Sequence, residues 1–175
     1  MSGELSRRAG QIRLALFDVD GVMTDGTLFI SESGESFKAF NILDGLGLKL
    51  LKSSGVATGI ITSRTSAAVE TRSTELAIDY LIQGAENKLK AYAKLRSQLG
   101  LDDHEVSYMG DDLPDLPVLR RCGLALSPPN AVEQVRETVH FVTRSGAGKG
   151  AVREACELIM QAQGTWQAQL DGYNT

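Results

Sequence analysis

Short apolar runs alternate with amphipathic segments along most of the chain. The runs have the length of buried strands, and they cover Leu14–Val19, Ala57–Thr62, Tyr80–Ile82, Val106–Met109, Leu124–Leu126 and Phe141–Val142. Between them, apolar residues recur at helical spacing, as in Leu46-Leu50-Leu51 and Leu89-Tyr92-Ala93-Leu99. Strands that alternate with helices are joined by crossover connections, which produce a parallel sheet covered by helices. The pattern therefore predicts an α/β fold, a Rossmann-like three-layer sandwich around a central parallel sheet.

One segment interrupts this alternation. Residues 27–31 and 35–40 flank Glu32-Ser33-Gly34, which is typical of a β-hairpin with a glycine-containing loop. We expect the hairpin to project as a flap, because it follows closely after the first strand. Its three phenylalanines give it more aromatic surface than an isolated hairpin can bury. These rings either pack on their own domain or form a subunit interface.

Composition narrows the class of protein. The 175 residues suffice for one compact domain, so we expect a single domain over residues 1–175 with about ten residues at each end as tails. The net charge of −4 gives no basis for nucleic-acid binding. No apolar run approaches the roughly 20 residues of a membrane span, and no signal peptide is evident. We therefore expect a cytoplasmic protein that acts away from membranes, and we expect Cys122 and Cys156 to be free thiols.

Acidic, hydroxyl and basic side chains follow four of the apolar runs. They are Asp18, Asp20, Thr62, Ser63, Arg64, Lys88, Asp111, Asp112 and Asp115. Because parallel strands end at the same edge of a sheet, these side chains can converge there. Two carboxylates as close as Asp18 and Asp20 repel each other and need a balancing charge. Oxygen ligands without a His/Cys cluster favour Mg²⁺ over zinc as the source of that charge.

This set of groups suits phosphoryl transfer, in which catalysis is mostly positioning and charge neutralisation. One aspartate would attack phosphorus and the other would move protons to and from oxygen. Thr62 and Lys88 would hold the phosphoryl oxygens, and Asp111 would share the metal ion with the nucleophile. Asp112 also fits a helix cap. Arg64 and Arg72 are candidate anion binders, whereas His104 and His140 are expected to be incidental.

The order of these motifs resembles that of the haloacid dehalogenase superfamily of phosphatases. Asp18-Val19-Asp20-Gly21-Val22 resembles its nucleophile motif, and Ile60-Ile61-Thr62-Ser63-Arg64 its second motif. Lys88 and Gly110-Asp111-Asp112-Leu113-Pro114-Asp115 match the third and fourth motifs. The resemblance implies that Asp18 is the nucleophile and that Asp20 is the acid/base.

A closer resemblance extends over nearly the whole chain. Residues 18–26, 38–45 and 148–154 are similar to those of the 3-deoxy-D-manno-octulosonate 8-phosphate phosphatases, which make a lipopolysaccharide precursor. This similarity implies a capless, magnesium-dependent homotetramer that hydrolyses a small sugar-acid phosphate. It implies that the metal ligands are Asp18, Asp20 (through its backbone carbonyl) and Asp111. It also implies the substrate contacts Asp20, Asn41, Asp44, Gly45, Lys49, Arg64, Arg72, Lys88 and Asp112.

Motif spacing leaves no room for a cap domain between Thr62 and Lys88. A phosphoryl site open to water is poorly desolvated, so we expect a neighbouring subunit to cover it with its hairpin or its 146–150 segment. This favours the interface interpretation of the hairpin. Two other functions stay open: hydrolysis of a related phosphate such as 2-keto-3-deoxy-nononate 9-phosphate, and a non-catalytic regulatory domain. The presence of both Asp18 and Asp20 disfavours the regulatory domain.

Overall fold

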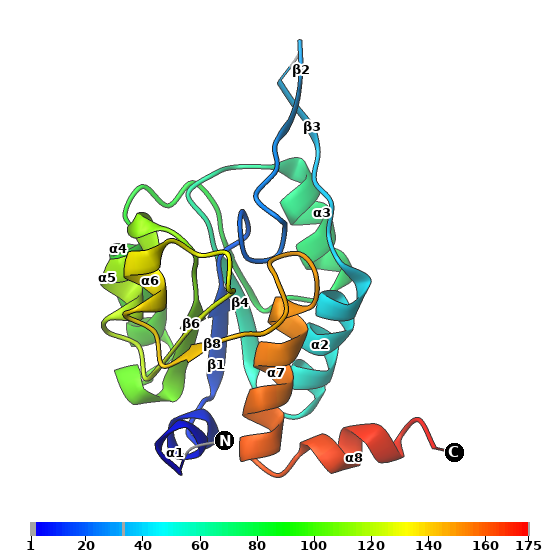
Figure 1. Cartoon of the computed structure of the whole chain (residues 1–175), viewed down its shortest axis with the longest axis vertical. Helices are drawn as coiled ribbons and strands as arrows, with labels where there is room; N and C mark the ends of the chain where they lie inside the picture. Colours follow the sequence, from blue (N-terminus) through cyan, green and yellow to red (C-terminus); the bar gives the residue numbers. More distant parts are fainter. Residues whose placement is uncertain (1–2, 33, 175) are drawn as a thin grey trace.

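The computed structural model describes residues 3–32 and 34–174, and a six-stranded parallel sheet lies at its centre (Figure 1). The strands are β1 (Leu14–Phe17), β4 (Ala57–Ile61), β5 (Tyr80–Ile82), β6 (Val106–Met109), β7 (Leu124–Ser127) and β8 (Phe141–Val142). They lie in the order β5-β4-β1-β6-β7-β8, and every neighbouring pair is parallel. The predicted α/β fold with a central parallel sheet is confirmed.

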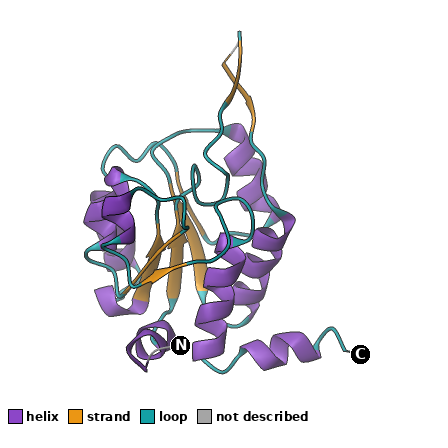
Figure 2. Ribbon diagram, viewed as in Figure 1, coloured by secondary structure: helices purple, strands orange, loops and turns teal. Residues whose placement is uncertain are grey.

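Helices form a layer on each side of the sheet (Figure 2). One layer contains α1 (Gly3–Gly10), α2 (Ile42–Ser53), α3 (Ala67–Glu75) and α7 (Ala151–Ala162). The other contains α4 (Lys88–Gln98), α5 (Leu116–Leu119) and α6 (Glu133–Arg136). The 3₁₀ turns η1 (Asp103–Glu105) and η2 (Leu113–Asp115) lie beside β6, and α8 (Trp166–Asp171) follows α7.

The central strand β1 separates two hydrophobic cores. Side chains alternate between the faces of a strand, so Phe17 packs with α2 and α7, while Leu16 packs toward α4 and α5. All four residues of β1 are buried. Burial of a side chain such as Phe17 contributes about 1.5–3 kcal/mol to stability. The cores therefore hold β1 rigidly, and with it the loop that begins at Asp18.

The hairpin between β1 and α2 projects from the body of the protein (Figure 1). It consists of β2 (Phe29–Ser31) and β3 (Gly34–Phe37), which pair antiparallel. The rings of Phe29 and Phe37 stack on each other with centroids 4.5 Å apart, yet these residues remain 41% and 56% exposed. Phe40, in contrast, packs against the core. Only one of the three rings therefore packs on its own domain.

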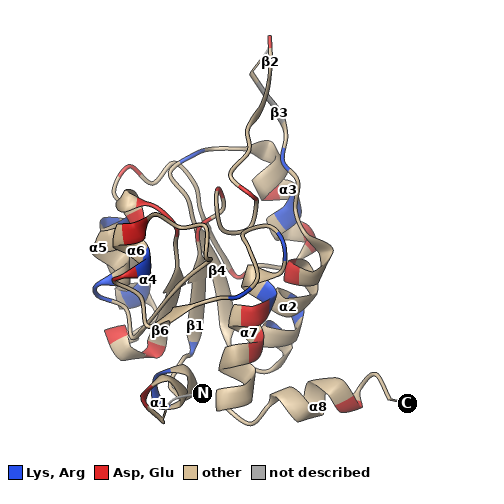
Figure 3. Ribbon diagram, viewed as in Figure 1, with Lys and Arg blue, Asp and Glu red and all other residues tan. Residues whose placement is uncertain are grey.

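A short helix lies near each end of the chain. Residues 3–10, expected to belong to a tail, form α1, in which Glu4 pairs with Arg7 and Arg8 and Ala9 is buried. Near the other end, Trp166 of α8 packs against the core and lies 5.4 Å below the Arg153 guanidinium. Asp171 is the single charged residue of α8 (Figure 3).

Cys122 and Cys156 are buried free thiols, as predicted. Over residues 3–32 and 34–174, none of the helices combines the length and the apolar character needed to cross a membrane.

Candidate active site

The loops after β1, β4 and β6 and the start of α4 meet at the carboxyl edge of the sheet. They enclose a cavity of about 170 Å³ that is lined by Asp18, Asp20, Thr62, Ser63, Arg64, Lys88, Asp111, Asp112, Pro114 and Asp115. The structure thus gathers all the side chains that the sequence placed after the four runs. Pockets for drug-sized ligands usually occupy about 300–1,000 Å³, so this cavity fits a phosphoryl group better than a whole sugar phosphate.

Backbone hydrogen bonds place Asp18 at the base of the cavity. Its N–H donates to Met109 O at 3.0 Å, which extends the β1–β6 ladder by one residue. The chain then turns sharply, because the N–H groups of Val22, Met23 and Thr24 all point at Val19 O. Gly21 allows this turn with φ +82°. The Asp18 side chain is therefore held in the cavity by rigid backbone on both sides.

Lys88 connects two carboxylates beneath the cavity. It is the first residue of α4, whose N-cap Asn87 accepts a hydrogen bond from Lys90 N. Its Nζ lies 2.7 Å from Asp18 Oδ2 and 2.7 Å from Asp115 Oδ1. Burial disfavours the charged ammonium, but attraction to both carboxylates outweighs it and raises the Lys88 pKa. Lys88 therefore stays positively charged.

Asp115 is the centre of the hydrogen-bond network, although the sequence predicts no separate role for it. Its Oδ1 accepts from Lys88 Nζ and from the Tyr108 hydroxyl, both at 2.7 Å. Its Oδ2 accepts from the backbone N–H groups of Asp111 and Asp112 at 3.0 and 3.2 Å. These bonds use about the four lone-pair positions that a carboxylate offers. Asp115 thus orients Lys88 and the loop between β6 and η2. The sequence feature that could have indicated this role is the acidic spacing of Asp111, Asp112 and Asp115.

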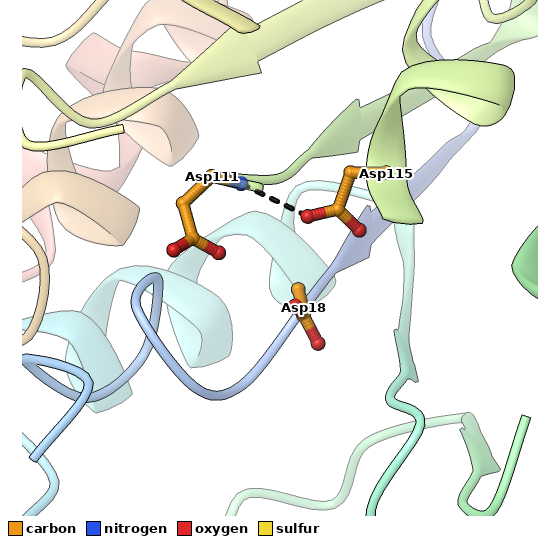
Figure 4. A group of neighbouring side chains, drawn as sticks. All are labelled: Asp18, Asp111 and Asp115. Carbon is orange, nitrogen blue, oxygen red and sulfur yellow. Dashed lines mark hydrogen bonds between the residues drawn. The ribbon is translucent and has the colours of Figure 1, made fainter. Parts of the chain in front are cut away.

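The residues fit a divalent cation. Oxygens of Asp18, Asp111 and Asp115 lie within 4.8 Å of one another (Figure 4). Asp111 Oδ1 is buried and has no hydrogen-bond partner among the described residues. Because the oxygens of Asp115 are already satisfied, Asp18 and Asp111 are the carboxylates best placed to hold the ion. The chain also leaves space for Asp111, since a Cβ at Gly21 would overlap its Oδ2.

The electrostatics of the cavity agree with a cation site. Burial, followed by repulsion from Asp18 and Asp115, raises the pKa of Asp111 to about 7. Burial also raises the pKa of Asp18 to about 6, because repulsion from Asp115 adds to it and Lys88 only partly offsets it. Lys88 alone therefore leaves excess negative charge, which a divalent cation can neutralise.

Asp20 also lines the cavity, and its carboxylate interacts with two basic side chains. Its Oδ1 accepts a hydrogen bond from Lys38 Nζ at 2.5 Å. Its Oδ2 lies 3.7 Å from Arg64 Nε. Lys38 was not among the expected site residues, because it lies 18 positions away on the far side of the hairpin. The Asp20 side chain is absent from the Asp18–Asp111–Asp115 group, so the expected metal contact through its backbone carbonyl stays a prediction.

Five expected substrate residues do not line the cavity: Asn41, Asp44, Gly45, Lys49 and Arg72. Asp44 is buried and accepts hydrogen bonds from Gly150 N and Arg153 N, so it caps the start of α7. Asn41 is the N-cap of α2 and also donates to Gly148 O. In this single chain, both therefore act as helix caps.

The remaining expected substrate residues lie along α2 and α3. Gly45 gives room to Arg72, since a Cβ there would overlap its guanidinium. Arg72 pairs with Glu75 at 2.8 Å and lines a separate groove of about 400 Å³ together with Lys38 and Phe40. Lys49 is exposed on α2. In the single chain these three residues therefore lie outside the cavity, and only Lys49 among them is exposed.

Known proteins are similar to this chain in sequence and in fold. A family model of haloacid dehalogenase-like hydrolases matches residues 71–155. The 3-deoxy-D-manno-octulosonate 8-phosphate phosphatase KdsC of Yersinia pestis is 42% identical over 163 residues, which cover 93% of this chain and 87% of that protein. The chain belongs to the haloacid dehalogenase-like hydrolases. Within them it belongs to the family of the 3-deoxy-D-manno-octulosonate 8-phosphate phosphatases, and it is a phosphatase.

Solved structures agree with this placement. The phosphatase of that name from Moraxella catarrhalis, in complex with magnesium, phosphate and KDO, is 42% identical with a TM-score of 0.96. A probable YrbI family phosphatase from Pseudomonas syringae pv. phaseolica 1448a is 50% identical with a TM-score of 0.97. Each alignment covers 99% of both chains. The similarity therefore includes every loop that forms the cavity.

Proposed function

We propose that the protein hydrolyses 3-deoxy-D-manno-octulosonate 8-phosphate to the free sugar acid and phosphate, in lipopolysaccharide precursor synthesis in the cytoplasm. The observation that carries this proposal is the convergence of Asp18, Lys88, Thr62 and Asp111 in one cavity of phosphoryl size. The Moraxella catarrhalis structure, which is similar over the whole chain and holds KDO, phosphate and magnesium, supports the choice of substrate.

Asp18 is the proposed nucleophile. Its buried carboxylate lies at the base of the cavity, where it can attack phosphorus and form an aspartyl-phosphate. Lys88 and Thr62 line the same cavity and can hold the phosphoryl oxygens during the attack. Asp20 gives a proton to the leaving sugar oxygen and then takes one from the water that hydrolyses the intermediate.

Magnesium is the proposed cofactor. Asp18 and Asp111 would hold it, with the Asp20 carbonyl as a further ligand. When bound, the ion neutralises the carboxylates and the phosphoryl oxygens, so that an anionic nucleophile can approach an anionic substrate. The unpartnered Asp111 Oδ1 supports this assignment.

The proposed active assembly is a homotetramer. After β1 the described chain contributes only the hairpin, and between Thr62 and Lys88 it forms only α3 and β5, so no cap covers the cavity. Leu28, Phe29, Ile30 and Phe37 form an exposed apolar surface on the hairpin. Hairpins of neighbouring subunits can bury these side chains together and cover the site. In the covered site, the proposed substrate contacts are Asn41, Asp44, Gly45, Lys49, Arg64, Arg72 and Asp112.

A phosphate-release panel tests the substrate. It compares 3-deoxy-D-manno-octulosonate 8-phosphate with 2-keto-3-deoxy-nononate 9-phosphate and with simple hexose phosphates, each with Mg²⁺ and with chelator. We expect the eight-carbon acid to have the highest kcat/KM and to require Mg²⁺. A higher kcat/KM for another sugar phosphate contradicts the proposed substrate. Light scattering tests the assembly, and a fully active monomer contradicts the tetramer.

A further inference from the structure

Lys38 links the projecting hairpin to Asp20. It follows directly after β3, and its ammonium is hydrogen-bonded to Asp20 Oδ1. Its side chain is only 2% exposed, although the residue just before it, Phe37, is exposed. We propose that Lys38 is a positioning residue that orients the Asp20 carboxylate for proton transfer to the leaving oxygen. This inference rests on the proposed acid/base role of Asp20.

The two oxygens of Asp20 have different surroundings. An ammonium group donates hydrogen bonds and cannot accept them, so Oδ1, which faces Lys38, can only be an acceptor. Oδ2 is buried and forms no hydrogen bond with the described residues, and Arg64 Nε at 3.7 Å is too far away for one. A proton carried by Asp20 therefore sits on Oδ2. From there it passes to the leaving oxygen as the P–O bond breaks and its electron pair moves to that oxygen.

The ion pair matters for orientation more than for stability. Desolvation of two partly buried charges offsets most of their attraction, so such pairs add little net stability. The hydrogen bond nevertheless restricts the rotation of the Asp20 carboxylate. Without Lys38, either oxygen of Asp20 can turn toward Arg64, and the carboxylate loses its fixed orientation.

The hairpin controls where Lys38 lies. Phe37 stacks on Phe29, and this contact ties the two strands together one residue before Lys38. Lys38 also lines the groove that contains Phe40 and Arg72. A contact that orders the hairpin, such as association with another copy, therefore also orders Lys38 and through it Asp20.

The leaving group of the substrate provides the test. Hydrolysis of an alkyl phosphate expels a strongly basic alkoxide and needs an acid, whereas p-nitrophenyl phosphate expels a stable phenolate and does not. For Lys38→Met, we expect kcat/KM, which reports the steps up to departure of the leaving group, to fall about 100-fold with 3-deoxy-D-manno-octulosonate 8-phosphate and to change less than about 3-fold with p-nitrophenyl phosphate. The value of kcat should fall with both substrates, because Asp20 also activates the water that hydrolyses the common intermediate. Lys38→Arg, which keeps a donor cation, should recover part of the lost kcat/KM.

Two controls separate this result from general damage. Lys94→Met removes an exposed lysine on α4, away from the cavity, and should leave both activities unchanged. Thermal unfolding should show that Lys38→Met is folded, and Lys38→Gln carries the same expectation if the Met variant is not. Equal losses of kcat/KM with both substrates, or no loss with either, overturn the positioning role.

Asp20→Asn distinguishes the failure of this inference from the failure of the proposed function. If Asp20→Asn loses kcat/KM equally with both substrates, Asp20 is not the acid and that part of the proposed function is wrong. If Asp20→Asn loses kcat/KM selectively with the alkyl phosphate but Lys38→Met does not, Asp20 acts without Lys38 and the positioning role is overturned. Selective losses in both variants support the proposal.

Discussion

The ammonium group of Lys88 lies 2.7 Å from the carboxylate of Asp18, and both side chains are buried. The same ammonium also serves Asp115, so one positive charge stands against the carboxylates of Asp18, Asp111 and Asp115. This excess of negative charge favours the binding of a divalent cation. It also means that the stability of the protein depends on pH and on metal.

The first prediction concerns magnesium and pH. The raised pKa values of Asp18 and Asp111 mean that the folded, metal-free protein holds protons that the unfolded chain releases. The stability of the metal-free protein should therefore fall as the pH rises from 3.8 toward about 7. Mg²⁺ binds the ionised carboxylates, so its stabilising effect should grow over the same interval. Thermal unfolding at pH about 5 and about 8, with Mg²⁺ and with chelator, measures both effects. An equal Mg²⁺ effect at both pH values argues against this site.

The second prediction concerns Lys88. Replacement by Met removes the internal cation and leaves Asp18 and Asp115 unpaired. Loss of one partner of a buried ion pair usually costs about 3–5 kcal/mol, so we expect a decrease of this order in the free energy of unfolding at neutral pH. Mg²⁺ should restore more stability to Lys88→Met than to the wild type. Denaturant unfolding with and without Mg²⁺ measures this, with Lys94→Met as the exposed control. A variant as stable as the control contradicts this charge balance.

The third prediction concerns Gly21. The methyl group of an alanine there would overlap Asp111 Oδ2, so Asp111 must move. Gly55→Ala is a matched control, because Gly55 also has a positive φ of 97° but open space where the methyl group would lie. Backbone strain should cost each variant about 1 kcal/mol of stability, and the overlap with Asp111 should add to the loss in Gly21→Ala. Only Gly21→Ala should lose Mg²⁺ affinity by calorimetry. Unchanged affinity in Gly21→Ala would show that Asp111 does not hold the metal.

The fourth prediction concerns Tyr108, whose buried hydroxyl donates to Asp115. Tyr108→Phe removes one of the hydrogen bonds that hold the Asp115 carboxylate. Hydrogen bonds to charged groups contribute about 1.5–3 kcal/mol, and urea unfolding should show a loss in this range. Tyr173→Phe alters an exposed tyrosine and should leave the stability unchanged. If both variants behave alike, the Tyr108–Asp115 contact is unimportant.

The strands of the sheet could be predicted from the sequence because each is a short, buried apolar run. β5, β6 and β8 begin and end where the pattern places them, and β1 is shorter because the chain turns after Asp18. The short helices α1, α6 and α8 were not predicted. Each has at most a turn or two of amphipathic pattern, and their formation depends on packing against the rest of the fold.

The site residues that follow a strand could be predicted, since the carboxyl ends of parallel strands share one edge. Tyr108 could not, because it lies inside β6 and its hydroxyl reaches Asp115 only through the tertiary fold. The contact of Lys38 with Asp20 depends on how the hairpin folds back toward the sheet, which the local sequence does not reveal. Asp44 is the opposite case, a residue that the sequence marks as a site residue but that does not line the cavity. The resemblance implies substrate binding, whereas in the single chain Asp44 caps α7 through a contact 109 positions away.

The most direct test of the central claim is identification of the phosphorylated residue. The protein is mixed with 3-deoxy-D-manno-octulosonate 8-phosphate and Mg²⁺, quenched with acid during turnover, reduced with borohydride and digested for mass spectrometry. The proposed mechanism predicts that Asp18 is converted to homoserine, and that this product disappears when chelator replaces Mg²⁺. Reduction at another residue, or rapid turnover without any modified Asp18, would contradict the proposed mechanism.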